Sequence, residues 1–551
     1  MINTYKSRKL DTWLIIGVLL IGLVLRSRGV DFGLPYEYHV DENQYVRQAA
    51  TMGNAGLKPA DWFNPPFLKY LYLAEFGGLY FVGHLSGQYS SIQDFGNQLS
   101  LDPTWLYLLA RWTSVLMSTV TVYIVYLIGA KGYNRRVGVI SGFLTAIAFL
   151  PVREAHFAVN DTAATLWVTI VLLSAIGIQQ SRQWRWYLLA GIALGLGFAT
   201  KYHVLICIPT IIIAHFLTPG RSWQIKSLNR LIACFAISVG TAIIASPYFL
   251  ISINEVWEDA YRLIWSGQYG FAGWEIDPSG GYLFYLKTLV WGLGWAGALI
   301  STISIFYAFF HHSATDIILV SLPLILYIFL GSQSMYFGRF FLPAISSLIL
   351  LSTNMIVQFS KSFFKNPLLQ SLFLISLVVI FSLQPLLASI RFGELLNQED
   401  TRTMAKKWIE KNIPEGARIA MDWQFHTPPL STREKPIAET GKVYEIWYPD
   451  FTLGKGLSDH PLDWYKSKGY EYLISSSFIY EMQLCDPLEN TKRNQFYSSL
   501  SETTTLLATF SPGNPGENQS FIFDEIYGPA ISLRQRMRPG PTINIYKLNS
   551  Q

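Results

Sequence analysis

The feature that most constrains this fold is a series of apolar runs long enough to approach or cross the ~30 Å hydrocarbon core of a bilayer. A bilayer interior offers no water to backbone N–H and C=O groups, so runs that span it form helices. Composition agrees, because 51% of the 551 residues are hydrophobic and 14% are charged, whereas soluble domains carry about 25% charge. We therefore predict an all-α multi-pass membrane part with about eleven transmembrane helices. The runs lie near residues 12–28, 105–130, 137–152, 162–179, 186–200, 203–218, 229–250, 282–310, 316–331, 340–358 and 367–389.

The first apolar run is the weakest of the series. From Trp13 to Leu25, at ~1.5 Å per helical residue, it is shorter than the hydrocarbon core. It follows three basic residues, as the apolar part of a cleaved signal peptide does, but Arg26-Ser27-Arg28 after it makes a poor cleavage site. A signal peptide and a membrane helix both place Asp41 on the same side of the membrane.

Basic residues collect in alternate connections between the runs, and this pattern sets the orientation of the chain. One set of connections holds Lys6, Arg8, Lys9, Lys131, Arg135, Arg136, Arg182, Arg185, Arg221, Lys226, Arg230, Lys361 and Lys365. The short connections of the other set carry Arg153, Lys201 and Arg339 almost alone. Basic loops stay in the cytoplasm, so we expect a cytoplasmic N-terminus in the cell (cytoplasmic) membrane. An odd number of spans then places the long loops 26–104 and 251–281 outside, together with the C-terminal end.

The tail, residues 391–551, differs in composition from the membrane part, residues 1–390. Glu399–Lys411 has the apolar face of a helix, which Pro414 and Gly416 end. Short runs that favour strands follow at Arg418–Met421, Tyr472–Ser475 and Ile543–Tyr546. We therefore predict a small extracytoplasmic α/β domain that does not carry the chemistry. Its Asp422 and His426 are near each other, and we expect them on a turn before Pro428-Pro429.

Charge, cysteine content and repeats narrow the function classes. Three cysteines argue against a disulfide scaffold. A net charge of +5 and a pI of 8.8 need no nucleic-acid partner to explain them. No internal repeat of fixed period is evident, which weakens the hypothesis of an inverted-repeat transporter.

Two adjacent acids, Asp41 and Glu42, follow the first apolar run by about one short loop. Like charges raise each other's pKa, and a nearby low dielectric penalises both, so such a pair beside a bilayer indicates chemistry or ion handling. His39 stands two residues before Asp41, which suggests a metal site. A His-x-Asp pattern alone is weak evidence for one, because a ligand set needs more converging groups. A divalent cation therefore stays a possible cofactor, and no other cofactor is indicated.

Further polar residues lie at membrane borders that topology assigns to the same outer side. They are Arg153, Glu154, His156, Asn160, Asp161, Lys201, Tyr202, His203 and Arg339. Each one alone fits a solvated or snorkelling helix end, and Asp161 could simply cap a helix that begins at Thr162. Arg111 lies about four residues inside a span, and we expect it to snorkel to the near interface. Asn64-Pro65-Pro66 is expected to form a stiff turn.

The order of several short motifs resembles the GT-C glycosyltransferases, in particular the protein O-mannosyltransferases and aminoarabinose transferases of family 39 and relatives. The resemblance covers roughly residues 10–390, and the tail is similar to the small outer domain of many members. The resemblance implies that this tail covers the active-site mouth. Its motifs are Asp41-Glu42 with Tyr45, Ala49-Ala50 and Met52; Asn64-Pro65-Pro66-Phe67; Ala110-Arg111-Trp112; His156–Asp161; Gly191–Thr200 leading into Lys201-Tyr202-His203; and Gly338-Arg339-Phe340-Phe341-Leu342-Pro343. One departure is Asn64 and Phe67, where many members have His or Lys before Pro-Pro-Leu, and this puts in doubt a basic group for donor phosphate there.

The resemblance implies an enzyme that moves a sugar from a polyprenyl-phosphate donor to an extracytoplasmic protein, lipid or glycan acceptor, with inversion. Asp41 is expected to be the general base. Arg339 and Lys201 are expected to hold the donor phosphate. Glu42, Asp161 and His203 complete the expected substrate-binding residues, with Asp161 on the sugar, the acceptor or a cation.

Three other hypotheses stay open. A transporter or flippase of lipid-linked sugars predicts ionisable residues near the midplane and on more than one side, whereas here they gather on one face. A non-catalytic membrane scaffold with an outer binding domain would tolerate loss of the Asp41 charge. A phosphate-releasing polymerase or oligosaccharide transferase would share the fold.

Overall fold

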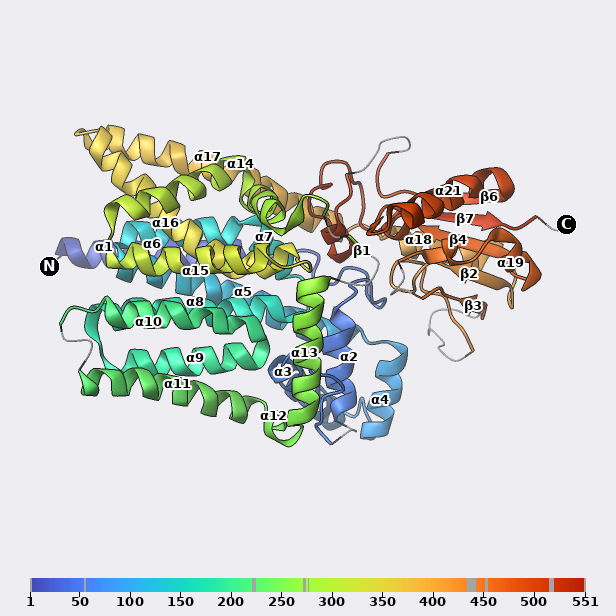
Figure 1. Cartoon of the computed structure of the whole chain (residues 1–551), viewed down its shortest axis with the longest axis horizontal. Helices are drawn as coiled ribbons and strands as arrows, with labels where there is room; N and C mark the ends of the chain where they lie inside the picture. The colour runs from blue at the N-terminus through green and yellow to red at the C-terminus, as the bar shows by residue number, and fades with distance from the viewer. Residues whose placement is uncertain are drawn as a thin grey trace.

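The computed structural model describes residues 2–53, 56–220, 224–270, 274–275, 277–433, 442–450, 454–514 and 520–549. A bundle of long helices forms one side of the molecule, and a smaller part containing the sheet forms the other (Figure 1). The N-terminus lies at the far end of the bundle and the C-terminus at the far end of the smaller part. We call the end of the bundle that faces the sheet the tail end.

Helices occupy every apolar run predicted from the sequence. They are α1 (Ile2–Ser27), α5 (Thr104–Gly132), α6 (Arg135–Ile147), α7 (Phe149–Glu154), α8 (Asn160–Ser181), α9 (Trp184–Thr200), α10 (Ile208–Phe216), α11 (Ile225–Ala245), α14 (Gly280–His311), α15 (Ala314–Gly331), α16 (Leu342–Phe363) and α17 (Pro367–Leu396). The run at 137–152 is divided between α6 and α7, because Ala148 leaves the helical conformation with ψ of 130°. The boundary predicted near residue 390 falls inside α17, which continues to Leu396.

By length and composition, 7 helical segments of the described chain could cross a membrane. They are Thr104–Gly132, Asn160–Ser181, Ser227–Ala245, Gly280–His311, Ala314–Gly331, Gly338–Phe363 and Pro367–Asn412. Shorter apolar helices occur at Thr12–Ser27 and Tyr202–Phe216. The multi-pass, mostly helical fold is therefore confirmed, while the count of about eleven crossings stays a prediction.

The two long loops of the prediction contain helices of their own. Loop 26–104 holds α2 (Glu42–Met52), α3 (Phe67–Leu85) and α4 (Ile92–Leu101), and loop 251–281 holds α13 (Ile253–Tyr269), which follows the short α12 (Tyr248–Ile251). In Figure 1 these helices stand across the direction of the bundle, at its tail end. Their limits were not predicted from the sequence, because Gly and Pro interrupt the apolar stretches of these loops.

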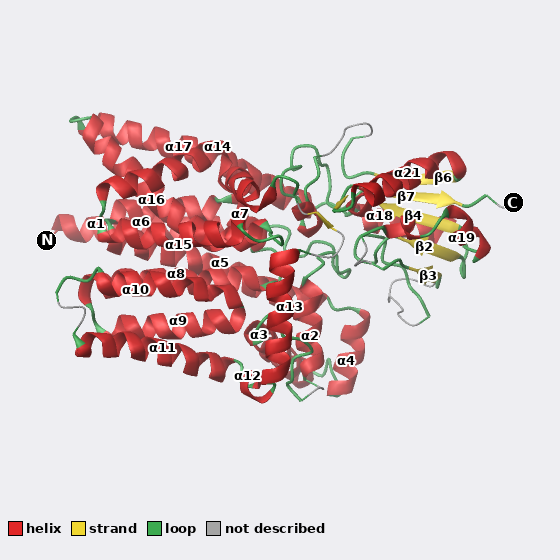
Figure 2. Cartoon of the chain, viewed as in Figure 1, coloured by secondary structure: helices red, strands yellow, loops and turns green. Residues whose placement is uncertain are grey.

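The tail folds around a five-stranded mixed sheet with the order β3-β2-β4-β7-β6. The strands are β2 (Arg418–Met421), β3 (Glu445–Trp447), β4 (Tyr472–Ser476), β6 (Thr505–Phe510) and β7 (Ile543–Lys547). Strand β2 runs parallel to β3 and β4, and β7 is antiparallel to β4 and β6. Helices α18 (Thr401–Asn412), α19 (Leu462–Ser467) and α21 (Pro487–Thr503) accompany the sheet. Strands gather at this end and helices fill the rest (Figure 2), which confirms the predicted α/β tail.

Besides the chain that continues from α17, two of the described contacts between the tail and the bundle bear on the site. Strand β1 (Trp274–Glu275), from the loop before α14, pairs antiparallel with β5 (Gln483–Leu484) of the tail. The described residues 520–542 between β6 and β7 make the second contact, and we call them the docking segment. It contains the 3₁₀ helix η5 (Phe523–Tyr527), whose apolar side chains belong to the same buried cluster as those of the bundle. The dark-red ribbon of this segment lies between the bundle and the sheet (Figure 1).

Candidate active site

Four charged side chains meet at the tail end of the bundle, and we call Asp41, Asp161, Lys201 and Arg339 the cluster. Arg339 Nη2 lies 2.7 Å from Asp41 Oδ2, and Arg339 Nε lies 3.6 Å from Asp161 Oδ2. Lys201 Nζ donates to Asp161 Oδ1 at 2.5 Å. Residues hundreds of positions apart thus form one network of two carboxylates and two cations.

Local structure explains how each member is presented. Asp41 immediately precedes α2, and Asp161 lies in the first turn of α8, where a negative charge complements the helix dipole. Lys201 follows α9, at the helix end that favours a positive charge. Arg339 lies on the 3₁₀ helix η2 (Gly338–Phe341), directly before α16. Helix α8 begins at the end of the pair where its neighbour α9 ends, so Asp161 and Lys201 meet there, away from the connection between the two helices.

The members of the cluster differ in their access to solvent. The Asp41 side chain is 21% exposed, whereas those of Asp161, Arg339 and Lys201 are 4%, 8% and 9% exposed. Arg339 Nη1 is buried and has no hydrogen-bond partner among the described residues. An unpartnered buried guanidinium nitrogen is costly, so the cluster has spare capacity to bind an anion. Asp41 is its accessible carboxylate.

Asp161 does not cap a helix that begins at Thr162, so the simple capping role considered for Asp161 is wrong. Helix α8 begins at Asn160, and the residue before it, Val159, makes no side-chain capping bond. The Asp161 carboxylate instead faces Lys201 and Arg339. Buried cations provide more favourable partners than a solvated helix end would.

Glu42 lies apart from the cluster, although it follows Asp41 directly. Its two oxygens accept hydrogen bonds from Arg111 Nε and Nη2 at 2.8 Å each, and Ala158 N donates to Oε1 at 2.8 Å. Arg111 Nη1 donates to the carbonyl oxygens of Val30 and Phe32 at 2.9 Å. The predicted snorkelling of Arg111 is wrong, because its side chain and that of Glu42 are 0% exposed.

His39 lies beside Asp41 and is held as a neutral imidazole. The backbone N–H of Asp41 donates to His39 Nδ1 at 3.3 Å, and the ring packs against Phe157 and Tyr527. Burial and the nearby Arg339 guanidinium hold the pKa of His39 well below its ordinary value. Among the described residues, no group of three or more His, Cys, Asp or Glu side chains is arranged to hold a metal ion.

His203 is half-buried on the 3₁₀ helix η1 (Tyr202–Cys207), two residues after Lys201. Its ring packs against Phe340, with a centroid distance of 5.8 Å, and Lys201 Nζ lies 4.5 Å from the centroid of the same phenyl ring. His203 therefore borders the cluster without joining its ion pairs.

The Asn64-Pro65-Pro66 turn reaches the same place. Asn160 Nδ2 donates to Asn64 Oδ1 at 2.8 Å and to the carbonyl oxygen of Thr200 at 3.0 Å. Asn64 is thereby linked to residues adjacent to both Asp161 and Lys201. The predicted turn is therefore one wall of the site, supported by an amide rather than by a cation.

Arg153, Glu154 and His156 are not solvated helix ends, because all three are completely buried. Arg153 forms an ion pair with Glu154, and its Nη2 donates to the carbonyl oxygens of Asp524 at 2.7 Å and Gly528 at 3.0 Å. His156 lies within hydrogen-bond distance of the carbonyl oxygens of Val152 and Arg28. Of these three buried residues, Arg153 joins the bundle to the docking segment.

The docking segment brings two residues to the cluster that the sequence prediction missed. The Tyr527 ring centroid lies 4.0 Å from Arg339 Cζ. Asp524 Oδ2 accepts a hydrogen bond from the backbone N–H of Gly338 at 3.2 Å. The sequence feature that could have revealed them is the acidic pair Asp524-Glu525, which lies between apolar residues and repeats the pair Asp41-Glu42.

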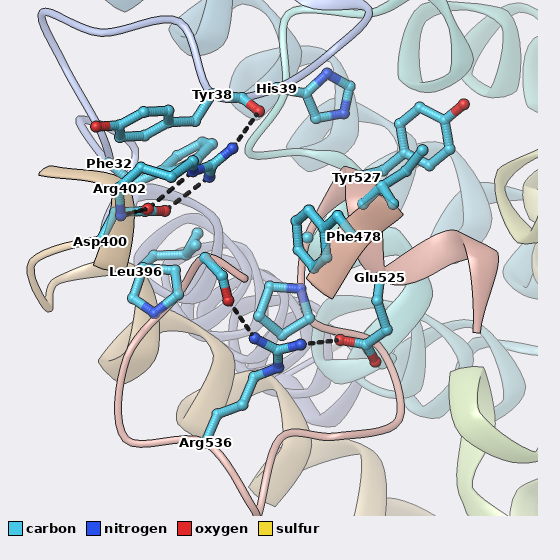
Figure 3. Close-up of a pocket in the computed structure, with 15 residues that line it drawn as sticks. Phe32, Tyr38, His39, Leu396, Asp400, Arg402, Phe478, Glu525, Tyr527 and Arg536 are labelled. Carbon is cyan, nitrogen blue, oxygen red and sulfur yellow. Dashed lines mark hydrogen bonds and ion pairs between the residues drawn. The ribbon is translucent and has the colours of Figure 1, made fainter. Parts of the chain in front are cut away.

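A pocket next to the cluster is lined by both parts of the molecule (Figure 3). Its walls come from the segment after α1, from the start of the tail and from the docking segment. Arg402 pairs with Asp400 at 2.7 Å, and Arg536 lies 3.3 Å from Glu525. Each of these two cations in the pocket wall therefore has a carboxylate of the same wall as its partner. His39 and Tyr527 line it as well, and they separate the pocket from Arg339.

The comparisons with known sequences point to transferases of lipid-linked sugars. A family model described as dolichyl-phosphate-mannose-protein mannosyltransferase matches residues 94–248. An undecaprenyl phosphate-α-4-amino-4-deoxy-L-arabinose arabinosyl transferase from Edwardsiella ictaluri is 26% identical over 47% of this chain and 44% of that protein. The corresponding transferase of Pseudomonas aeruginosa is 24% identical over 61% of this chain and 59% of that protein. The chain thus matches about half the length of these curated relatives.

Solved structures share the fold. ArnT from Cupriavidus metallidurans in the apo state superposes with a TM-score of 0.52 and 12% identity, covering 98% of both chains. The oligosaccharyltransferase AglB from Archaeoglobus fulgidus, in complex with an inhibitory peptide and a dolichol-phosphate, superposes with a TM-score of 0.54 and 12% identity. That match covers 92% of this chain and 74% of AglB. The GT-C fold predicted from the motifs is confirmed, and the chain is an integral membrane protein.

Proposed function

We propose that this chain is a membrane glycosyltransferase that moves a sugar from a polyprenyl-phosphate donor to an extracytoplasmic acceptor. The observation that carries the proposal is the contact between Asp41 and Arg339. An accessible carboxylate and a buried guanidinium with a free N–H group lie side by side. Acceptor activation and phosphate stabilisation need these two groups together.

In the proposed reaction, Asp41 accepts the proton of the acceptor nucleophile as the nucleophile attacks the anomeric carbon of the donor. The bond between that carbon and the phosphate oxygen breaks, and the phosphate leaves with the electron pair. Attack from the face opposite the phosphate inverts the anomeric configuration. Arg339 and Lys201 stabilise the charge that grows on the phosphate.

Arg339 connects the two halves of this reaction. Nη2 of Arg339 binds Asp41, and its unpartnered Nη1 is available to the phosphate. One guanidinium can thereby hold the base and the leaving group next to each other. Asp161 holds Lys201 in place beside them.

The likeness to lipid-dependent enzymes supports a polyprenyl-phosphate donor. ArnT was solved bound to undecaprenyl phosphate, and this chain superposes on it with a TM-score of 0.51. The AglB structure contains a dolichol-phosphate. We extend the shared chemistry, a phosphate on a long prenyl chain, to this protein. The acceptor is a protein, lipid or glycan.

We further propose that the cluster and the tail face away from the cytoplasm, with the N-terminus inside and the protein in the cytoplasmic membrane. The positive-inside distribution of Lys and Arg supports this orientation. A tag fused after the last residue is expected to be cleaved by protease added to intact spheroplasts. A protected tag would contradict the orientation and with it the proposed face of the reaction.

The test of function starts from a strain that lacks the gene. Mass spectrometry of its surface glycans identifies the sugar that disappears, and expression of the wild-type chain is expected to restore it. Asp41→Asn, made at equal protein level, is expected not to restore it. Asp102→Asn, at an exposed position before α5, serves as the matched control. Restoration by Asp41→Asn would favour the scaffold hypothesis over the enzyme.

A further inference from the structure

We infer that Tyr527 and Asp524 of the tail position Arg339 for the donor phosphate, so that the docking segment completes the active centre. This inference rests on the proposed function and deepens it. It assigns to the tail two positioning residues that act through Arg339, whereas the sequence predicted that the tail only covers the site.

The docking segment is fixed to the bundle by a buried arginine. Arg153, in α7, donates from Nη2 to the backbone carbonyl oxygens of Asp524 and Gly528. A buried guanidinium that lost these acceptors would leave N–H groups unsatisfied, at a substantial free-energy cost. These hydrogen bonds, which involve no residue of the sheet, therefore fix the position of the docking segment relative to α7.

Asp524 holds the backbone next to Arg339. Its Oδ2 accepts from the N–H of Gly338, and the side chain is 1% exposed. Only glycine fits at position 338 as the site is built, since a Cβ there would lie 2.5 Å from the Trp291 ring and 3.3 Å from Asp524 Oδ1. Asp524 thus fixes the start of η2, and with it the direction in which the Arg339 side chain leaves the backbone.

Tyr527 holds the guanidinium itself. Of the three aromatic rings around Arg339, that of Tyr527 is nearest, at 4.0 Å from Cζ, against 4.8 Å for Phe337 and 5.9 Å for Phe340. A ring at this distance attracts the cation, and the Tyr527 hydroxyl adds a further contact with Arg339. The N–H groups stay available for acids and for a ligand, and Asp41 and Asp161 occupy Nη2 and Nε.

Arg339 keeps a nitrogen for a ligand. Its Nη1 is buried without a partner among the residues that the structure describes. Arg111, in contrast, uses Nε, Nη1 and Nη2 in hydrogen bonds to Glu42 and to backbone carbonyl oxygens. Arg153 and Arg493 each retain an unpartnered Nε, so it is the position of Arg339 Nη1 beside Asp41 that points to a ligand. The docking segment therefore holds Arg339 in an orientation in which one nitrogen awaits an anionic oxygen.

The test measures binding of undecaprenyl phosphate, without sugar, to the full-length protein in detergent. Tyr527→Leu removes the ring and is expected to raise the Kd about tenfold. Tyr527→Phe keeps the ring and is expected to stay within about twofold of wild type. The matched control is Tyr470→Leu, which removes a tail tyrosine that packs on Arg418, outside the cluster. Equal affinity of Tyr527→Leu and wild type would overturn the inference while leaving the proposed function intact.

A double-mutant cycle tests that the effect passes through Arg339 and does not depend on how well Tyr527→Leu folds. In an Arg339→Lys background, Tyr527→Phe, Tyr527→Leu and Asp524→Asn are expected to change the Kd by less than about twofold, because the stacked guanidinium is gone. Losses that simply add in the two backgrounds would overturn the inference. Absence of any binding to the wild-type protein would overturn the proposed function and the inference with it.

Discussion

Two adjacent acids, Asp41 and Glu42, bind two different arginines, and the two arginines are in opposite states. Arg111 has all its partners, namely both oxygens of Glu42 and two backbone carbonyl oxygens, with no exposure of either side chain. Arg339 has Asp41 and Asp161, stacks on Tyr527, and retains an unbonded nitrogen. The complete pair is suited to holding the structure, and the incomplete pair to binding a ligand. Hydrogen-bond completeness separates them better than burial does.

The largest expected effect concerns the complete pair. Arg111→Ala leaves the Glu42 carboxylate buried and uncompensated, and is expected to cost about 3–5 kcal/mol of stability. Thermal unfolding of the purified protein in detergent measures the loss. Replacing both partners, as Arg111→Met with Glu42→Leu, is expected to recover much of it. Trp112→Ala, at an exposed neighbour, is the control. An unchanged unfolding temperature in Arg111→Ala would contradict the structural role.

The next prediction compares the adjacent acids by isosteric substitution. Asp41→Asn is expected to lower kcat by on the order of 10²-fold or more, because the general base is lost, while the unfolding temperature stays near that of wild type. Glu42→Gln is expected to do the reverse, lowering stability and sparing kcat per folded molecule. Steady-state kinetics and thermal unfolding on the same preparations decide between them. A pair of variants with equal kinetic defects would break the distinction.

Arg339→Lys tests whether the fork of the guanidinium matters beyond its charge. Lysine keeps the positive charge but cannot donate in parallel to an acid and a phosphate. We expect the donor KM to rise about tenfold, with a smaller change in kcat. Initial rates measured over a range of donor concentrations, at saturating acceptor, give both the donor KM and kcat. Impaired acceptor binding with an unchanged donor KM would reassign Arg339.

The smallest expected effect is that of Asp161→Asn. The amide retains a hydrogen bond to Lys201 but loses the charge, which we expect to cost about 1 kcal/mol, or roughly fivefold in kcat/KM. The unfolding temperature is expected to stay close to that of wild type. Full activity would show that Lys201 and Arg339 hold their places without this carboxylate.

Local patterns in the sequence predicted most of the fold. Apolar runs located the bundle helices because a hydrocarbon environment demands long apolar segments. Strand β2 begins and ends at the predicted Arg418 and Met421, since a short β-prone run between turn residues has clear limits. In loop 26–104, α2 and α4 were missed because they are only 11 and 10 residues long, whereas α3 is a 19-residue apolar helix whose limits the loop pattern did not reveal.

The site was predicted in part. Alternation of basic loops placed Asp41, Asp161, Lys201 and Arg339 on one face, and the structure brings them into contact. The partners of Glu42 and Arg339 were beyond prediction from local patterns. No local rule connects residue 42 with 111, or 339 with 527, because such contacts depend on how distant segments pack.

The Arg153 contact with the docking segment has a consequence for how the sequence can vary. Arg153 binds main-chain oxygens, which every residue type possesses, so these two hydrogen bonds place few demands on side-chain identity. Gly528 is the exception. Its φ is +133°, and a Cβ there would lie 2.9 Å from the Phe157 ring. The side chains of Asp524 and Tyr527 are therefore constrained by their contacts with the cluster, and not by the bonds from Arg153 that attach the segment.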